Sequence, residues 1–284
     1  MPVLSRIVAP NGVVFYRSPA LAAVGIPHGF STRVGGISAG PFASLNLGNP
    51  NGCPVQDPSA NIPLNYDRLH AAIGAVGRAR AFVHQVHGDR VVVATAGAAF
   101  DHHAKADAVV CTDLGRVAAV RVADCVPVLL ATADGRAVAA VHAGWRGVVA
   151  GVVTKAVEAL RRSAGEAGPA TGRAGAGGAG VPLVAAVGPS IGFDAFEVGP
   201  EVAAEFERAF GGDAAGLLKP SANAGKAMAD LRGGIRLQLL AAGVDVGAID
   251  TTDRCTFRDA EEFFSHRREN GVTGRMAALI GPVA

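Results

Sequence analysis

The sequence predicts a protein in which β-strands and α-helices share one core, organised around residues 117–147. Two apolar runs within this stretch, 128–132 and 137–142, flank an Asp-Gly pair. Asp-Gly between apolar runs is a strong short-range sign of a β-hairpin. Apolar residues then recur three and four positions apart from Val149 to Leu160, which is the spacing of one helix face.

The hairpin brings two reactive side chains to the same end of a sheet. Cys125 precedes the first strand and His142 closes the second, while the connecting Asp-Gly suits a type I′ turn with positive φ at both central positions. Turn residues and the helical pattern follow His142. A thiol, an imidazole and a helix N-terminus therefore meet, which predicts a metal site or a nucleophile site.

The same rhythm of strands and helices continues through the rest of the chain. Strands are predicted at 12–16, in two runs within 81–93, at 107–110, 183–187 and 274–280. Helices are predicted at 67–76, at 200–210 with Pro at the first position, and at 230–242 with Asp230 as N-cap and Gly243 as its end.

Three segments are predicted to lack regular structure. Residues 28–40 are rich in Gly, Ser and Thr and are interpreted as a loop, and residues 48–66 are rich in Pro and Asn. Residues 163–180 are rich in Gly and Ala, so we expect a flexible surface insertion whose deletion leaves activity within a few-fold. The insertion is not a domain boundary, because strand and helix patterns continue on both sides.

Composition excludes several classes of protein. The 284 residues are half apolar and 18% charged, with a net charge of +2 and no Lys/Arg cluster, which argues against nucleic acid as a partner. The four cysteines form no CxxC pair, which favours a reduced compartment. No apolar run reaches the roughly 18 residues of a membrane span and no signal peptide is visible, so we predict a cytoplasmic protein without a membrane partner.

Histidines elsewhere in the chain carry a weaker signal. His84 and His87 are three positions apart, and on a strand they would point to opposite faces of the sheet. They are therefore not interpreted as a chelating pair, and spacing alone makes His87 a weak ligand candidate. Adjacent His102 and His103 follow an aspartate in a polar turn, which is typical of a solvent-facing position.

Seven motifs, taken together, resemble the YfiH/laccase-domain family. They are HGFSTRVGG (28–36), SLNLG (44–48), QVHG (85–88), ADCVPVLL (123–130), HAGWRG (142–147), GPSIG…FEVG (188–199) and FFSHRRENGVTGR (263–275). Members have been called multicopper polyphenol oxidase, purine nucleoside phosphorylase and peptidoglycan editing factor. The resemblance covers nearly the whole chain and departs at residues 49–66 and at the Gly/Ala insertion. It implies one α+β domain over residues 1–284, a four-layer α/β/β/α sandwich of two mixed sheets.

The resemblance also implies a metal site formed by His87, Cys125 and His142. One Cys and two His with a fourth position open match a catalytic Zn²⁺ site, and Cu²⁺ is possible because it competes well at such sites. The family's chemistry implies phosphorolysis of adenosine, inosine, guanosine and methylthioadenosine, with adenosine deamination. Its partners are then a purine nucleoside and phosphate, and the chain is expected to be a monomer or weak homodimer.

A phosphate substrate needs positive or hydrogen-bonding groups around it. Arg and helix N-termini favour phosphate, so the helix predicted after Gly147 is one candidate. The side chains that we consider for substrate and phosphate are Arg33, Arg146, Arg267 and His28.

Three alternatives remain open from the residues alone. Cys125 with His142 and Asp124 could form a thiol-dependent or zinc-dependent amidase that edits peptidoglycan precursors. The Cys–His pair could instead hold a purely structural zinc, although such sites use four protein ligands and no fourth is evident. A multicopper polyphenol oxidase is disfavoured, because the chain has eight histidines and no His-x-His pair.

Overall fold

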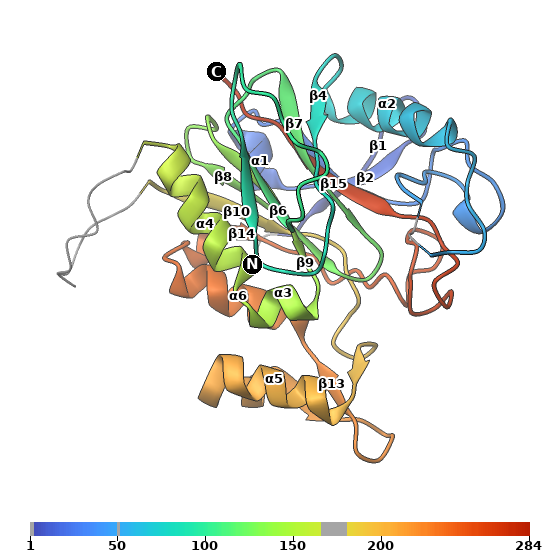
Figure 1. The fold of residues 1–284 in the computed structure, drawn as a ribbon, viewed down its shortest axis with the longest axis vertical. Helices are drawn as coiled ribbons and strands as arrows, with labels where there is room; N and C mark the ends of the chain where they lie inside the picture. Colours follow the sequence, from blue (N-terminus) through green and yellow to red (C-terminus); the bar gives the residue numbers. More distant parts are fainter. Residues whose placement is uncertain (1–2, 50–51, 166–180) are drawn as a thin grey trace.

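Two six-stranded sheets form the centre of the molecule (Figure 1). The computed structural model describes residues 3–49, 52–165 and 181–284. The first sheet has the order β1 (Ser5–Val8), β2 (Val14–Arg17), β3 (His28–Ser31), β15 (Met276–Ile280), β7 (Arg116–Val122), β4 (Ala79–Ala81). The second has the order β14 (Ile249–Asp250), β10 (Leu183–Val187), β8 (Val126–Thr132), β9 (Val138–Ala143), β6 (Ala108–Cys111), β5 (Val91–Ala94). Both sheets mix parallel and antiparallel pairs.

Helices lie around the two sheets. They are α1 (Pro19–Ala23), α2 (Asn61–Ile73), α3 (Trp145–Val149), α4 (Val152–Ser163), α5 (Pro200–Phe210) and α6 (Leu231–Ala241), with 3-10 turns η1 (Gly40–Phe42), η2 (Gly211–Gly216) and η3 (Val246–Ala248). In Figure 1, α2 lies beside β4 of the first sheet, whereas α4 and α6 lie on the side of the second. None of the helices in the described ranges has the length and apolar character that crossing a bilayer requires.

Three separate apolar cores define four layers. Leu129 packs between the two sheets, whereas Leu130 on the same strand packs between the second sheet and α4. The third core joins α2, through Leu69, to the outer face of the first sheet. Successive strand residues point to opposite faces, so the almost uninterrupted apolar sequence of β8 is explained by burial on both faces. The predicted α+β sandwich of two mixed sheets is confirmed.

The hairpin of β8 and β9 is present, and its turn differs from the prediction. Pro127 lies opposite His142, so Cys125 and His142 do lie at the same end of the sheet. The connection is not a type I′ turn, because Gly135 has φ of 73° but Asp134 does not have positive φ. The Asp134 carboxylate instead accepts hydrogen bonds from Thr132 Oγ1 (2.6 Å) and the Arg136 amide (3.1 Å). Side-chain bonding of this kind closes a longer loop.

Other predicted elements keep their place in the chain but change their limits. The strand at Leu183–Val187 and the helix at Pro200–Phe210 are confirmed, as is Asp230 as N-cap, whose carboxylate accepts from the Gly233 amide at 3.0 Å. The helix predicted at 67–76 begins at Asn61, within the segment expected to be irregular, and ends at Ile73. The helix predicted from Val149 is interrupted, because Gly151 adopts φ of 77° and separates α3 from α4.

The loop predicted at residues 28–40 is wrong in its first part. His28–Ser31 is the buried strand β3, paired with β2 and β15. A Cβ on Gly29 would lie 2.8 Å from both Phe15 and Ile73, so this glycine permits close packing of the strand against its neighbours. A composition that resembles a loop therefore belongs to a core strand. Of the insertion predicted at 163–180, residues 166–180 lie outside the described residues.

A small third sheet was not predicted. It contains β11 (Glu197–Val198), β13 (Ala227–Ala229) and β12 (Leu218–Pro220), in that order. With α5 it forms the lower part of the molecule in Figure 1. Strands this short offer too few residues for an alternating pattern to be recognised.

Candidate active site

Three potential ligands converge at one end of the second sheet. His87 lies in the connection between β4 and β5, Cys125 lies just before β8, and His142 lies within β9. One ligand atom from each side chain can be chosen so that all lie within 4.8 Å of one another, and the His87 and His142 rings meet edge to face with centroids 4.8 Å apart. The predicted convergence of these three side chains is confirmed. The opposite-face argument against His87 fails, because neither His84 nor His87 belongs to a named strand.

The backbone at the cluster adopts uncommon conformations. His87 has φ of 61° and Asp124, which precedes Cys125, has φ of 86°. Non-glycine residues with positive φ cluster at functional sites, where surrounding contacts hold them in place. One such contact is made by Gln85, whose side chain accepts from the Arg121 amide and donates to the Arg121 carbonyl, both at 2.8 Å. This two-point contact attaches the His87 segment to β7.

Asp107 lies behind the cluster and joins its two histidines. Its fully buried carboxylate accepts from His142 Nδ1 (2.8 Å), from the His87 amide (2.9 Å) and from the Gly88 amide (2.6 Å). Burial alone would raise the pKa of Asp107, but the hydrogen bonds from His142 and the two amides hold it below its usual value. The bond to Nδ1 directs His142 Nε2 towards Cys125, which is how metal-binding histidines are commonly oriented.

The thiol and imidazole of the cluster perturb each other's ionisation. Burial opposes a thiolate, but the charges and hydrogen bonds of His142 and His87 outweigh it and lower the pKa of Cys125 to about 6. Burial likewise opposes an imidazolium, but Cys125 and Asp107 raise the pKa of His142 to about 9. Without a metal, Cys125 is therefore a thiolate at neutral pH. The thiolate is the form of cysteine that binds metals and attacks electrophiles.

Asp124 is not the carboxylate partner of His142 that the amidase alternative assumed. Its two oxygens accept from Thr256 Oγ1 (2.6 Å) and from the Arg267 amide (2.7 Å). Asp124 thus ties the C-terminal segment to Cys125, and Asp107 takes the place that the alternative gave to Asp124. The sequence offered one sign that Asp107 belongs to the site, since Asp107 is a charged residue at the start of an apolar buried strand.

The cluster opens into a cavity of about 430 Å³. Two of the substrate candidates, Arg146 and Arg267, line it, together with the aromatic side chains of Trp145 and Phe196. The helix N-terminus proposed after Gly147 does not exist, because α3 begins at Trp145 and the next helix begins at Val152. The lining residues that the sequence analysis did not single out for the site include Asn49, Gln85, Arg121, His266 and Arg275.

Arg33 does not line the cavity, because its side chain is bound within the protein. Its guanidinium donates to the carbonyls of Ala43 (2.8 Å) and Ala260 (3.1 Å) and lies over the Phe264 ring, 4.6 Å from the centroid. It also reaches Glu269 Oε1 at 3.4 Å. Arg33 therefore stabilises the C-terminal segment and is not placed to contact a substrate.

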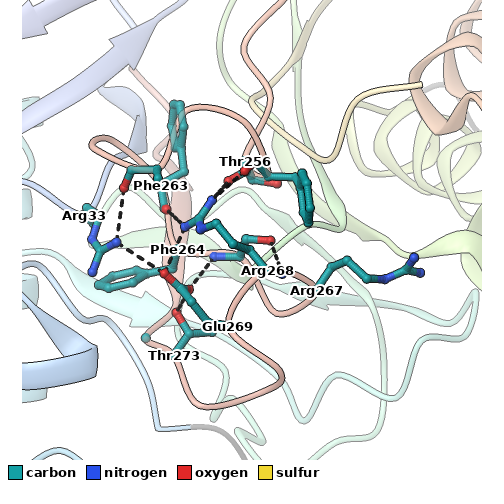
Figure 2. A network of polar contacts seen from close by, with 12 residues as sticks. Arg33, Thr256, Phe263, Phe264, Arg267, Arg268, Glu269 and Thr273 are labelled. Carbon is teal, nitrogen blue, oxygen red and sulfur yellow. Dashed lines mark hydrogen bonds and ion pairs between the residues drawn. The ribbon is translucent and has the colours of Figure 1, made fainter. Parts of the chain in front are cut away.

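Glu269 is the centre of this C-terminal network (Figure 2). Its carboxylate accepts from Arg268 Nη2 (3.0 Å), from the Ser265 amide (2.9 Å) and from the Thr273 hydroxyl. Figure 2 shows the Arg267 side chain pointing away from these contacts. The guanidinium of Arg267 reaches the Glu197 carbonyl at 3.0 Å. The network fixes the segment so that Arg267 is presented to the cavity.

His28 is also absent from the cavity lining, because it is a core residue of β3. Its Nε2 accepts from the Ser18 amide (2.9 Å), its Nδ1 donates to the Ile26 carbonyl (2.8 Å), and 1% of its surface is exposed. Burial lowers the pKa of His28 to about 4. The folded state therefore holds His28 as a neutral ring. Its role is structural, although the sequence around it resembles a loop.

The buried His28 predicts a loss of stability in acid. Between its unfolded pKa of 6.5 and its folded pKa of about 4, only the unfolded chain binds the proton, so stability falls as pH falls through this window. From pH 7 to pH 5 the wild type should lose about 2 kcal/mol more than His28→Gln. Urea unfolding of both proteins at the two pH values measures this difference. Equal losses would contradict the assignment.

Gly144 allows the cluster to be this compact. A Cβ at this position would lie 2.8 Å from His87 Cδ2 and 3.1 Å from Cys125 Sγ. We expect Gly144→Ala to displace both ligands and to weaken metal binding by about 10-fold or more, in the range of changes that disturb ligand orientation. Metal affinity measured by competition with a chromophoric chelator tests this. Gly212→Ala is the control, because nothing lies within 4 Å of a Cβ there, and unchanged affinity in Gly144→Ala would refute the expectation.

Fold and site together define a class of four-layer α+β protein with a Cys–His–His cluster at the end of one sheet. The chain belongs to the family described as multi-copper polyphenol oxidoreductase laccase, whose model matches residues 27–282. Among the described residues, which include all eight histidines, this cluster is the only group of three or more His, Cys, Asp or Glu that could hold a metal. One such group does not fit the several copper centres that the family description implies.

Relatives and solved structures agree with this membership. The chain is 36% identical over 270 residues to the purine nucleoside phosphorylase of Deinococcus radiodurans, covering 95% of this chain and 93% of the relative. It is 37% identical over 250 residues to the purine nucleoside phosphorylase YfiH of Escherichia coli, covering 88% and 91%. The structure of the hypothetical protein YfiH of Bacillus licheniformis matches with a TM-score of 0.81 at 27% identity, covering 98% and 99%. YlmD of Geobacillus stearothermophilus matches with a TM-score of 0.81 at 29% identity over both full chains.

Proposed function

We propose that the chain is a zinc-dependent purine nucleoside enzyme. Its reactions are phosphorolysis of adenosine, inosine, guanosine or methylthioadenosine, and deamination of adenosine. The observation that carries the proposal is that a metal-ligand cluster and four arginines line a single cavity of about 430 Å³. The names of the Deinococcus and Escherichia relatives support the same substrate class.

The donor set suits zinc. His87, Cys125 and His142 would hold the ion through two imidazole nitrogens and one thiolate, and Asp107 would orient His142 from behind. All three ligands line the cavity, so a substrate or water can approach the fourth position from that side. When bound, Zn²⁺ supplies a Lewis acid that polarises the substrate or acidifies a water molecule.

The residues of the cavity match the needs of phosphorolysis. A phosphate oxygen attacks C1′ of the ribose, the bond from C1′ to N9 breaks, and its electron pair leaves with the purine, which takes up a proton. Arginine guanidiniums neutralise the phosphate and hold it in position for attack. Trp145 and Phe196 offer aromatic surfaces against which a purine can stack. Deamination uses the same pocket, with water adding to C6 and ammonia leaving.

Product analysis tests the two reactions separately. Zinc-loaded protein is incubated with each nucleoside, with and without inorganic phosphate. Phosphorolysis should release the free base and ribose 1-phosphate (5-methylthioribose 1-phosphate from methylthioadenosine) only when phosphate is present, whereas adenosine should yield inosine in either case. Absence of both reactions with all four nucleosides in zinc-replete protein would refute the proposal.

A second candidate is a thiol amidase acting on peptidoglycan precursors. It is favoured by one observation, the chain of contacts that runs from the Cys125 thiolate through His142 to Asp107. This arrangement resembles the Cys, His and carboxylate sets of thiol hydrolases. It predicts amide hydrolysis by metal-free protein, which the zinc mechanism does not allow.

A further inference from the structure

We infer that inorganic phosphate binds between Arg121 and Arg275, at the end of the first sheet that faces the cavity. The inference rests on the proposed function and deepens it by naming the phosphate subsite. Both arginines line the cavity, and neither was among the candidates that the sequence suggested. The nucleoside would then lie between this pair and the metal ligands.

Sheet register places the two arginines next to each other. Strands β7 and β15 are antiparallel, and Arg121 lies opposite Ala277. Arg275 is two positions before Ala277, so the side chains of Arg121 and Arg275 lie on the same face as diagonal neighbours. On this face Ala119 and Ala277 belong to the core beneath α2. Arg121 and Arg275 are the next residues on this face, at the edge of the core, where the cavity begins.

Neither guanidinium of the pair forms an ion pair within the described part of the chain. No ion pair or side-chain hydrogen bond joins the Arg121 guanidinium to another residue in the described part of the chain, and its stem is confined beside Gly48, where a Cβ would lie 2.8 Å from Cδ and Nη1. Arg275 Nη1 donates to the carbonyls of Thr273 (3.2 Å) and Gly274 (3.0 Å), which carry no net charge. Both arginines are half-buried. Two like charges removed from water in this way are stabilised by an anion.

Electrostatics around the pair agree with this interpretation. Burial, followed by repulsion from Arg121, holds the pKa of Arg275 below its usual value. The charges of Cys125 and Asp124 favour the guanidinium but do not offset burial and repulsion. The oxygens of Asp124 accept hydrogen bonds from Thr256 and the Arg267 amide and form no direct bond to the pair. A dianion with several acceptor oxygens is the ligand that two planar guanidinium groups bind best.

The other two arginines of the cavity are less suited to hold phosphate. Arg146 and Arg267 are exposed, and each lies over an aromatic ring, Trp145 at 4.4 Å and Phe196 at 5.5 Å from the centroid. Exposed charges are screened by water and salt, so their contribution to binding a small anion is weak. Arg146 and Arg267 therefore attract anions to the cavity, whereas the half-buried Arg121 and Arg275 retain them.

Phosphate binding to the full-length, zinc-loaded protein tests the assignment. Isothermal titration calorimetry with inorganic phosphate is applied to Arg121→Gln and Arg275→Gln, and the KM for phosphate is measured with inosine. Each substitution should weaken phosphate binding by 10-fold or more while the zinc content stays at the wild-type level. Arg162→Gln is the matched control, because it removes one exposed arginine at the end of α4, and its phosphate affinity should stay within two-fold of wild type.

A charge-retaining variant keeps the test decisive if either glutamine variant fails to fold. Arg121→Lys preserves the charge but loses the planar fork, so phosphate affinity should fall less than in Arg121→Gln but measurably. Wild-type affinity in Arg121→Lys and Arg275→Lys together with a loss in Arg146→Gln would overturn the inference. Phosphate binding that depends on the pair, without phosphorolysis or deamination of any of the four nucleosides, would support the subsite and refute the proposed function. Phosphorolysis with an unchanged KM for phosphate in the Arg121 and Arg275 variants would support the proposed function and overturn the subsite.

Discussion

Cys125→Ser is expected to lose bound zinc and nucleoside activity together. The pKa of Cys125 is lowered to about 6, so the wild type offers a thiolate at neutral pH, whereas a serine hydroxyl remains protonated and binds zinc poorly. Loss of one of three protein ligands should reduce activity by more than about 100-fold, beyond the usual effect of disturbing a residue behind a ligand. Zinc content by atomic emission and turnover of inosine, measured on the same samples, give the two values to compare.

Metal removal from the wild type completes this experiment. A zinc-specific chelator should inactivate the enzyme, and added zinc should restore activity. Cys53→Ser is the matched control, since Cys53 is a free, half-buried cysteine outside the cluster, and it should keep its zinc. If Cys125 is instead a nucleophile, metal-free protein will remain active until alkylation of Cys125 abolishes the activity. Full phosphorolysis by rigorously metal-free enzyme would refute zinc catalysis.

Asp107→Asn is expected to have the second largest effect. The carboxylate accepts from His142 Nδ1 and from the amides of His87 and Gly88, so it orients both imidazole ligands. An asparagine has one acceptor oxygen and no charge, and it cannot satisfy all three donors. Metal affinity should fall by about 10–100-fold, and nucleoside turnover should fall with it at limiting zinc. Chelator competition measures the affinity directly.

The control for Asp107→Asn is an aspartate at the other end of the same strand. Asp113 accepts from the Gly115 amide and from Arg116 Nε, both at 2.9 Å, so its replacement also removes a carboxylate that bonds a backbone amide. Asp113→Asn should change thermal stability slightly and leave metal affinity unchanged. Equal metal affinity in both variants would show that Asp107 does not orient the ligands.

The confirmed predictions include several that depend on a short stretch of chain. The hairpin that brings Cys125 and His142 to one end follows from two apolar runs and a turn within about twenty residues, and the N-cap of α6 follows from the single side chain of Asp230 before the helix. The type I′ turn was wrong because the Asp134 side chain closes a longer loop. The loop at His28 was wrong because Gly and Ser are common in loops, and only packing against distant elements shows that here they belong to a strand.

The sequence by itself determined the mixed class of the fold, the hairpin and two of the three clustered ligands, because neighbouring residues decide these features. The resemblance of its motifs added His87. Only the tertiary structure showed that Asp107 lies behind His142 and that Arg33 and His28 lie outside the cavity. It also showed that Arg121 lies beside Arg275. Each of these depends on which strands pair across long stretches of chain. A single sequence carries the charge and polarity of such residues, but it does not carry the distances between them.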